Sequence, residues 1–267
     1  MRLSLKTFAF LLAGLAFVAL SGCDENGNFN LLSVEEDIEL GRQLDEQIQQ
    51  DTAYDVLPEA DYPQAYAYLR GMVDNILASG QVPYADAFPW KVTIIRDDST
   101  LNAFAAPGGY MYVYTGLIKY LDTEDQLAGV MGHEMGHAAL RHSSRNLTSQ
   151  YGTSLLLQVI LGDGANSTTV EVLRGLRGLQ YSRSFEREAD DASVEYLAET
   201  PGYACNAAAG FFVKLSESGQ ARPPEFLSTH PNPENRVTDI NAKAQEINCS
   251  TDAQADGTYD QFKARLP

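Results

Sequence analysis

The chain has 267 residues, of which 44% are hydrophobic, which suits one well-packed catalytic domain with short appendages. It contains 36 acidic and 19 basic residues, and its formal net charge is −17. Because such a surface repels a phosphate backbone, we set aside any nucleic-acid partner. We interpret the acidity itself as a property that keeps the protein soluble.

The first 22 residues are typical of a targeting segment, with Arg2 and Lys6 ahead of an apolar run over residues 7–20. That run is shorter than the roughly 20 residues that span a membrane. The next residues, Leu20-Ser21-Gly22-Cys23, resemble the lipobox of bacterial lipoproteins, which are cut before the cysteine and lipidated on it. An ordinary signal peptide with an incidental cysteine is the alternative.

Lipidation would place residues 23–32 as a tether between the membrane and the folded protein, which is then anchored rather than membrane-spanning. The predicted location is the bacterial cell envelope, facing the periplasm. Asp24 resembles an inner-membrane retention signal, but that rule varies between lineages and leaves the choice of membrane open. With Cys23 lipidated, Cys205 and Cys249 remain, and in an oxidising compartment we expect them to pair rather than stay as two buried thiols.

Residues 33–267 are predicted to form a single, mostly helical α+β domain with a small sheet. Ser33 and Glu36 fit a capping box that opens a helix to about residue 50. Strands are predicted over 90–95 and 110–114, with a strand end and a tight turn at 102–109 between them. Further helices are predicted over 64–77, 116–121, 124–141, 144–178 with a break at 161–167, 184–199, 206–216 and 233–247, and a proline-rich loop over 223–233.

The segment His133-Glu134-Met135-Gly136-His137 lies on the predicted helix over 124–141. Residues four apart share a helix face, so both imidazoles can bind one metal ion, and Glu134 can reach a water there without being a ligand. A chance pentapeptide on an ordinary helix is the alternative. Because the surrounding residues are small or apolar, two buried histidines need polar partners, and a metal ion supplies them.

A catalytic zinc site takes three protein ligands, so a third is expected on another helix. Glu186 and Asp190 are four apart, so that one can bind the metal while the other holds a ligand histidine. We expect Glu188 to point elsewhere and to be solvated. His142 is interpreted as a favourable cation near the end of the metal-binding helix, outside the site.

The block from His133 to His137, followed by Ser182-Arg183 and by Glu186-Arg187-Glu188-Ala189-Asp190, resembles the HtpX-like and CAAX-prenyl-protease-like zinc peptidases, peptidase family M forty-eight. The resemblance implies a zincin-type domain in which Glu186 is the third zinc ligand and Asp190 the aspartate of the Glu-x-x-Ala-Asp motif.

Two further blocks extend the resemblance. Residues 102–109 and 114–117 look like the edge-strand segment of the family, and Thr229-His230-Pro231 with Arg236 looks like its C-terminal His-Pro motif. The blocks run in family order from about residue 90 to 240. The match is closest to soluble, periplasmic lipoprotein-type members, since we find neither transmembrane helices nor a tetratricopeptide tail.

The expected reaction is hydrolysis of a peptide bond with one Zn²⁺ per chain and Glu134 as general base. His230 is the candidate donor to the oxyanion, supported by Arg236. Alternatively, His230 occupies the fourth metal position and holds the enzyme latent, or is a loop residue without a role. Substrate is expected to add as an extended strand beside Asn102, Ala103, Phe104 and Ala105.

That binding mode uses mainly main-chain hydrogen bonds and suits unfolded or misassembled envelope proteins, the task that the family resemblance implies, with the envelope assembly machinery as a possible partner. The first alternative function is a chaperone or assembly factor with a latent zinc site. A structural zinc module is disfavoured, because such sites usually close all four positions with Cys or His, and the chain has three cysteines.

Overall fold

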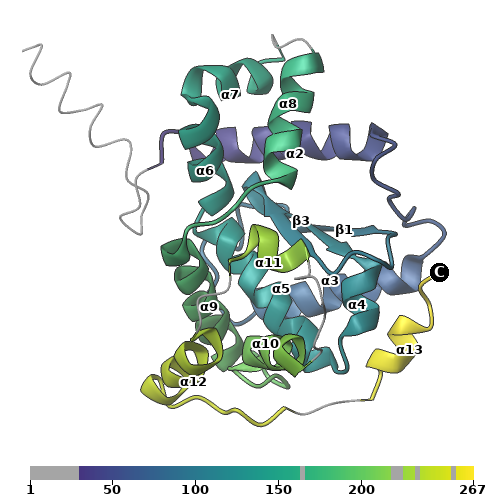
Figure 1. Cartoon of the computed structure of the whole chain (residues 1–267), viewed down its shortest axis with the longest axis vertical. Coiled ribbons are helices and arrows are strands. Elements are labelled where there is room, and N and C mark those ends of the chain that lie inside the picture. Colours follow the sequence, from purple (N-terminus) through teal and green to yellow (C-terminus); the bar gives the residue numbers. More distant parts are fainter. Residues whose placement is uncertain (1–29, 163–165, 218–224, 232–234, 254–256) are drawn as a thin grey trace, which may run out of the picture.

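The computed structural model describes residues 30–162, 166–217, 225–231, 235–253 and 257–267 (Figure 1). The predicted signal peptide over 1–22, the predicted lipidation site Cys23 and the tether up to residue 29 lie outside these ranges. Within them, no helix combines the length and the apolar character needed to cross a membrane.

A three-stranded sheet lies at the centre, in the order β1 (Lys91–Ile95), β3 (Tyr110–Tyr114), β2 (Ala103–Ala106). β1 is parallel to β3, and β2 is antiparallel to it. The turn that joins β2 to β3 packs on α2 (Val34–Gln50). Gly108 has φ 71°, and a Cβ atom there would lie 2.6 Å from Ile38 Cα, so only glycine fits this turn.

Helices cover both faces of the sheet, and the predicted mostly helical α+β class is confirmed. They are α3 (Pro63–Leu77), α4 (Thr115–Tyr120), α5 (Glu124–Ala139), α6 (His142–Tyr151), α7 (Thr153–Ile160), α8 (Asn166–Arg177), α9 (Arg183–Ala198), α10 (Ala207–Glu217), α11 (Glu225–Thr229), α12 (Arg236–Glu246) and α13 (Tyr259–Lys263). In Figure 1, α6 to α8 stand over α2 at one end, and α9, α10 and α12 gather around α5 at the other.

The sheet separates two hydrophobic cores, because successive side chains of a strand point to opposite faces. On β3, Met111 and Val113 join the core of α3, α5, α9 and α10. Tyr112 and Tyr114 join the core of α2 and α6 to α8. The helix that carries His133 and His137 therefore lies between the sheet and a second layer of helices.

The predicted capping box of α2 is present: Glu36 N–H donates to Ser33 Oγ (3.1 Å), and Ser33 N–H donates to Glu36 Oε2 (2.7 Å). α5 is shorter than predicted and ends at Ala139. Arg141 then adopts a left-handed conformation (φ 58°), which starts α6 in a new direction at His142. Its guanidinium Nε donates to Asp37 Oδ2 of α2 (2.6 Å), which holds the α5–α6 junction on α2.

Two other expectations were wrong, and one helix was not predicted. The helix predicted over 144–178 breaks at Gly152 (φ 77°) as well as at its loop. The predicted proline-rich loop over 223–233 contains α11, and α13 was not predicted. Short helices of about one turn have too little periodicity to appear in a hydrophobic pattern.

α5 makes its closest approach to a neighbouring backbone at Gly129. A Cβ atom there would lie 2.2 Å from the main-chain nitrogen of Ala208 in α10, so the two helices are in backbone contact. Such contact fixes the position of α5 along its axis, and therefore the positions of His133 and His137 relative to the neighbouring helices.

A disulfide joins Cys205 and Cys249, with an S–S distance of 1.95 Å. It connects the start of α10 to the end of α12, and Cys205 N–H donates to Ser250 O across the junction (2.9 Å). The 44-residue separation encloses His230 and Arg236.

Candidate metal centre

α5 supplies two imidazoles and one carboxylate. His133 and His137 lie one helical turn apart, and their Nε2 atoms are 3.0 Å from each other. Both rings and the side chain of Glu134 are buried. The apolar face of α5 thus brings three ionisable groups into the protein interior, where each needs a partner.

α9 supplies two carboxylates from the opposite side. Ser182 caps this helix by accepting from Phe185 N–H, which places Glu186 in the first turn. Glu186 Oε1 lies 3.4 Å from His137 Nε2, and Oε2 lies 3.5 Å from His133 Nε2. Asp190, one turn further, contacts the other nitrogen of His133, with Oδ1 2.9 Å from Nδ1.

His230 follows α11 and completes the cluster. Its Nδ1 lies 3.0 Å from Glu186 Oε1 and 3.3 Å from His133 Nε2. One potential ligand atom from each of His133, His137, Glu186 and His230 falls within 4.8 Å of the other three. Imidazole and carboxylate donors in this number are the ligands that zinc takes in proteins.

Arg236 of α12 neutralises the acidic side of the cluster. Its Nε donates to Asp190 Oδ2 (2.7 Å) and its Nη1 to Glu186 Oε2 (2.8 Å). The guanidinium stacks on the ring of Phe212, 4.0 Å from the centroid. Because the planar fork contacts two carboxylates at once, it fixes both relative to α5.

The protonation of the cluster reflects these contacts. Burial favours a neutral Glu186, but His230, His133 and His137 outweigh it and hold its pKa well below the usual range. Burial and the neighbouring His133 lower the pKa of His137. Burial alone would also lower the pKa of His133, but its bonds to Asp190 and Glu186 raise it to about 9.

Glu134 is the exception among these groups. Neither of its carboxylate oxygens has a hydrogen-bond partner among the described residues, and His230 Nε2 lies 3.5 Å from Oε1. Burial raises its pKa. A buried carboxylate without a donor beside four converging ligand atoms fits a metal ion with an attached water, which would supply the missing partner.

His142 is not where the sequence placed it. Expected to be a helix-end cation, it is fully buried at the start of α6, and burial lowers its pKa. Its Nδ1 lies 2.9 Å from His137 Nδ1. This expectation failed because α5 ends two residues early and a new helix begins. Glu188, expected to be solvated, is 43% exposed, and its Oε2 also lies 3.2 Å from His142 Nε2.

The predicted substrate strand over residues 102–105 is the edge strand β2, but its residues are buried. Ser143 Oγ donates to Ala105 O (2.6 Å). Phe226 N–H of α11 donates to Leu101 O (3.1 Å), just before the strand. The outer edge is therefore contacted by α6 at Ala105, and the segment that leads to His230 contacts the chain just before the strand.

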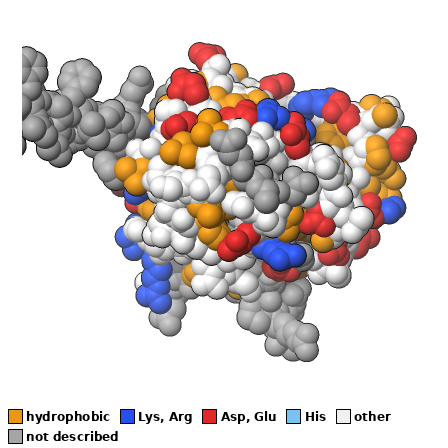
Figure 2. Space-filling view, turned by 90° about the horizontal axis from the view of Figure 1, so that it is seen from above, with side chains coloured by type: hydrophobic (Ala, Val, Ile, Leu, Met, Phe, Trp, Pro, Cys, Tyr) orange, Lys and Arg blue, Asp and Glu red, His pale blue; other side chains and the backbone are white. Residues whose placement is uncertain are grey.

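Sequence reasoning missed Tyr181, whose ring stacks on His137 with centroids 3.8 Å apart. Its hydroxyl contacts Ser143 Oγ (2.7 Å), and its N–H donates to Thr229 O (3.1 Å). A tyrosine directly before a helix cap carries no motif, so no sequence signal marks it. All four histidines of the chain are buried, and none is visible on the face shown in Figure 2.

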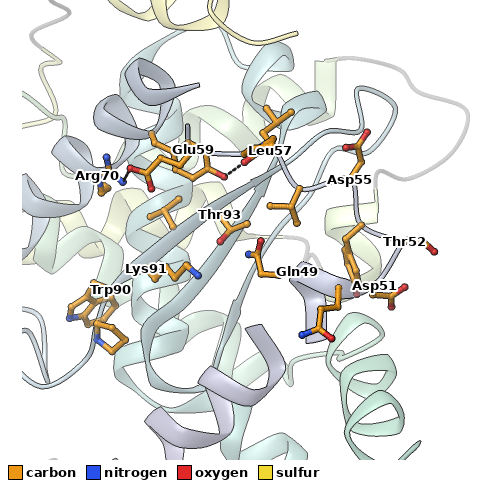
Figure 3. A pocket seen from close by; sticks show the side chains of 17 residues that line it. Gln49, Asp51, Thr52, Asp55, Leu57, Glu59, Arg70, Trp90, Lys91 and Thr93 are labelled. Atoms are coloured by element: carbon orange, nitrogen blue, oxygen red, sulfur yellow. Dashed lines mark hydrogen bonds and ion pairs between the residues drawn. The ribbon is translucent and has the colours of Figure 1, made fainter. Parts of the chain in front are cut away.

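A surface cavity of about 700 Å³ lies away from the cluster, between the end of α2 and the outer edge of β1 (Figure 3). Arg70 and Glu59 form an ion pair in its wall (2.6 Å). None of the metal-centre residues lines it, and we assign it no role.

The chain is similar in sequence to several known proteases. A putative beta-barrel assembly-enhancing protease of Vibrio cholerae is 34% identical over 174 residues, 59% of this chain and 35% of that protein. The beta-barrel assembly-enhancing protease of Escherichia coli K12 is 31% identical over 189 residues, 65% of this chain and 38% of that protein.

The mitochondrial metalloendopeptidase OMA1 of Arabidopsis thaliana is 31% identical over 163 residues, 60% of this chain and 32% of that protein. The matched regions thus cover between 32% and 38% of the length of these three relatives. The family model described as Peptidase family M48 matches residues 63–244, which include the sheet, α5, α9 and His230. The chain belongs to peptidase family M48.

Proposed function

We propose that this chain is a zinc metalloendopeptidase. The observation that carries the proposal is the convergence of His133, His137 and Glu186 beside the buried carboxylate of Glu134, which has no hydrogen-bond partner among the described residues. Three protein ligands with a neighbouring general base are the composition of a catalytic zinc site, whereas a structural site closes all its positions.

A bound zinc ion would polarise the peptide carbonyl and lower the pKa of an attached water. Glu134, whose pKa burial raises, accepts a proton in the first step and gives it to the leaving amine in the second. Asp190 holds the Nδ1 side of His133, which leaves Nε2 free for the metal. Arg236 keeps Glu186 and Asp190 in place.

The resting site is proposed to be latent, with His230 as a fourth ligand. Two observations support this: His230 lies within the ligand cluster, and α11 ahead of it contacts the chain just before the strand where substrate would add. For an extended substrate to pair with β2, the bond from Ser143 to Ala105 O must open, and α11 must leave Leu101 O and carry His230 with it. His230 is then available as the donor to the oxyanion, the role first expected of it.

The proposed substrates are unfolded or misassembled proteins of the cell envelope. Strand addition to β2 reads main-chain groups rather than particular side chains, which suits such a broad range. Two of the relatives are named for enhancing beta-barrel assembly, which supports the envelope assembly machinery as a partner. An assembly factor with a permanently closed zinc site is the second candidate, favoured by the position of His230.

The proposed location is the bacterial envelope, with lipid on Cys23 holding the protein to a membrane on its periplasmic side. The sequence Leu20-Ser21-Gly22-Cys23 supports it. Mass spectrometry of the N-terminal peptide from membrane-purified protein tests this: an unmodified Cys23 in that peptide would rule the anchor out.

The test of the peptidase uses the chain from residue 24 onward, which keeps every described residue, with an unfolded casein substrate. We expect cleavage that requires zinc, stops with a chelator, and falls at least about a hundredfold in Glu134→Gln. That variant should still bind one zinc per chain, since Glu134 is not in the ligand cluster.

The matched control is Glu199→Gln, an exposed glutamate at the end of α9 that should cleave like the wild type. Full cleavage by Glu134→Gln would refute the mechanism. Stoichiometric zinc without cleavage in the wild type and in His230→Ala would favour the assembly factor instead.

A further inference from the structure

We propose that His142 and Glu188 are positioning residues that fix metal ligand His137 through a chain of hydrogen bonds from carboxylate to histidine to histidine. The inference rests on the proposed metal site and deepens it, because it concerns the second nitrogen of a ligand rather than the ligand set itself. His142 lies outside the motifs that identify the site, and Glu188 occupies a variable position of the Glu-x-x-Ala-Asp motif.

The three side chains form a continuous line that ends at the ligand cluster. His137 Nε2 faces the cluster, 3.0 Å from His133 Nε2 and 3.4 Å from Glu186 Oε1. On the other side of the ring, its Nδ1 lies 2.9 Å from His142 Nδ1. The far nitrogen of His142, Nε2, lies 3.2 Å from Glu188 Oε2.

When a metal is bound to His137, only one placement of the ring protons allows both hydrogen bonds of this line to form. Nε2 of His137 must be free of a proton to be a ligand, so the ring carries its proton on Nδ1. Nδ1 of His142 must then accept, so His142 carries its proton on Nε2, and that proton points at Glu188. The carboxylate therefore sets the tautomer of His142, and His142 sets the tautomer of His137.

The backbone and packing hold His142 in this orientation. Arg141, in a left-handed conformation, directly precedes His142, where α6 begins, and the turn directs the His142 side chain inward. The imidazole is fully buried and stacks on Phe185, with centroids 4.2 Å apart and ring planes 7° from parallel. Arg145 covers the ring of Phe185, 4.4 Å from its centroid.

The two histidine ligands are thus supported differently. His133 contacts the carboxylate of Asp190 directly, at 2.9 Å, whereas His137 reaches a carboxylate only through His142. Glu188 is 43% exposed, so water screens its charge, while the buried His142 has no substitute. Loss of His142 should therefore weaken metal binding more than loss of the charge on Glu188.

The experiment measures the zinc dissociation constant of the chain from residue 24 onward by competition with a colorimetric chelator. His142→Phe keeps an aromatic ring to stack on Phe185 but cannot accept from His137. We expect it to weaken zinc binding by about 10- to 100-fold. Glu188→Gln keeps an acceptor but loses the charge, and we expect a loss of roughly three- to tenfold.

Two measurements separate positioning from a general structural role. The free energy of unfolding of each metal-free variant reports on packing alone. The visible absorption of the cobalt-substituted protein reports on ligand geometry, and its bands should shift in His142→Phe but not in the Glu199→Gln control.

Wild-type zinc affinity in both variants, with or without a change in metal-free stability, would overturn the inference and leave the peptidase proposal standing. A wild-type chain that binds no zinc would instead remove the metal site itself. If His142→Phe does not fold, Glu188→Gln decides: a weakened affinity supports the chain of hydrogen bonds, and an unchanged affinity with unshifted cobalt bands overturns it.

Discussion

His230 contacts both the ligand cluster and Glu134, and in the latent state proposed above its position keeps the site closed. Its Nδ1 faces Glu186, and its Nε2 lies 3.5 Å from Glu134, the proposed base. A side chain so placed both fills a ligand position and blocks the space where a substrate carbonyl would lie. Removing it should therefore have opposite effects on metal binding and on turnover.

We expect His230→Ala to bind zinc about tenfold more weakly, because one donor is lost. We also expect it to cleave an unfolded substrate several-fold faster at saturating zinc, because opening the closed resting site outweighs the loss of the oxyanion donor. The measurements are a chelator competition and the rate of casein cleavage. Ser228→Ala, an exposed change on α11 just ahead of His230, is the control. A fall in turnover with unchanged zinc affinity would show that His230 acts only as the oxyanion donor.

Among the elements, α5 carries the metal-binding histidines and is buried from Leu127 to Ala139. Its contact with α10 depends on a missing side chain at Gly129, where an added Cβ would lie 2.2 Å from a main-chain atom. Because backbone cannot rotate away as a side chain can, the two helices would have to separate to admit a methyl group.

We expect Gly129→Ala to reduce the free energy of unfolding by about 1–3 kcal/mol, as overpacking does. Gly71→Ala on α3 is the matched control, since no atom lies within 4 Å of the added Cβ there. It should be neutral or stabilise by roughly 0.5–1 kcal/mol through helix propensity. Urea unfolding measures both; equal effects would show that α10 moves aside freely.

α2 is tied to the α5–α6 junction by a buried network around Asp37. Its Oδ2 accepts from Arg141 Nε (2.6 Å) and from Ser144 Oγ (2.9 Å). Burial nevertheless raises the pKa of Asp37 from 3.8 to about 6, since these bonds only partly offset it. A folded-state pKa above the unfolded one means that the folded protein binds this proton more tightly.

The stability from Asp37 is thus fully present below about pH 4, and is lost as the pH rises to about 6. Relative to Asp37→Asn, which cannot titrate, the wild type should lose up to roughly 3 kcal/mol across this window. Urea unfolding of both proteins between pH 4 and 7 gives the difference. A difference that grows with pH would show that the bond to Arg141 outweighs burial.

At the scale of the whole molecule, the disulfide is the only covalent link between distant segments among the described residues. It closes a loop with a 44-residue separation. A loop of this length removes chain entropy worth about 4 kcal/mol from the unfolded state, an upper value because native strain subtracts from it.

We therefore expect dithiothreitol to lower the free energy of unfolding by about 2–4 kcal/mol. The double variant Cys205→Ser, Cys249→Ser should be as unstable as the reduced wild type and indifferent to the reductant. Zinc content of the oxidised and reduced chains is measured on the same samples. An unchanged stability after verified reduction would show that the α10–α12 contact holds the loop without the bond.

The sequence was sufficient to predict the elements whose signals are local. The capping box placed α2 to within a residue, and the spacing of His133 and His137 placed both imidazoles on one face. The family motif directed attention to Glu186, which lies within the ligand cluster.

What could not be predicted depends on where helices turn. Nothing local indicates that Arg141 leaves the helical region, and the bond that accompanies this turn reaches Asp37, more than a hundred residues earlier. From that turn follow the inward position of His142 and its contact with Glu188. The contacts that α6 makes with the edge strand and α11 makes just before it are likewise tertiary contacts that no periodicity reports.

The loop closed by the disulfide holds two of the residues that complete the centre, His230 and Arg236. In a reducing environment the ends of this loop are not joined. The segment that carries Arg236, which bonds Glu186 and Asp190, is then held by non-covalent contacts only. Reduction of this one bond would therefore loosen two parts of the centre at once, and we expect the redox state of the surroundings to influence how completely the ligand cluster is held together.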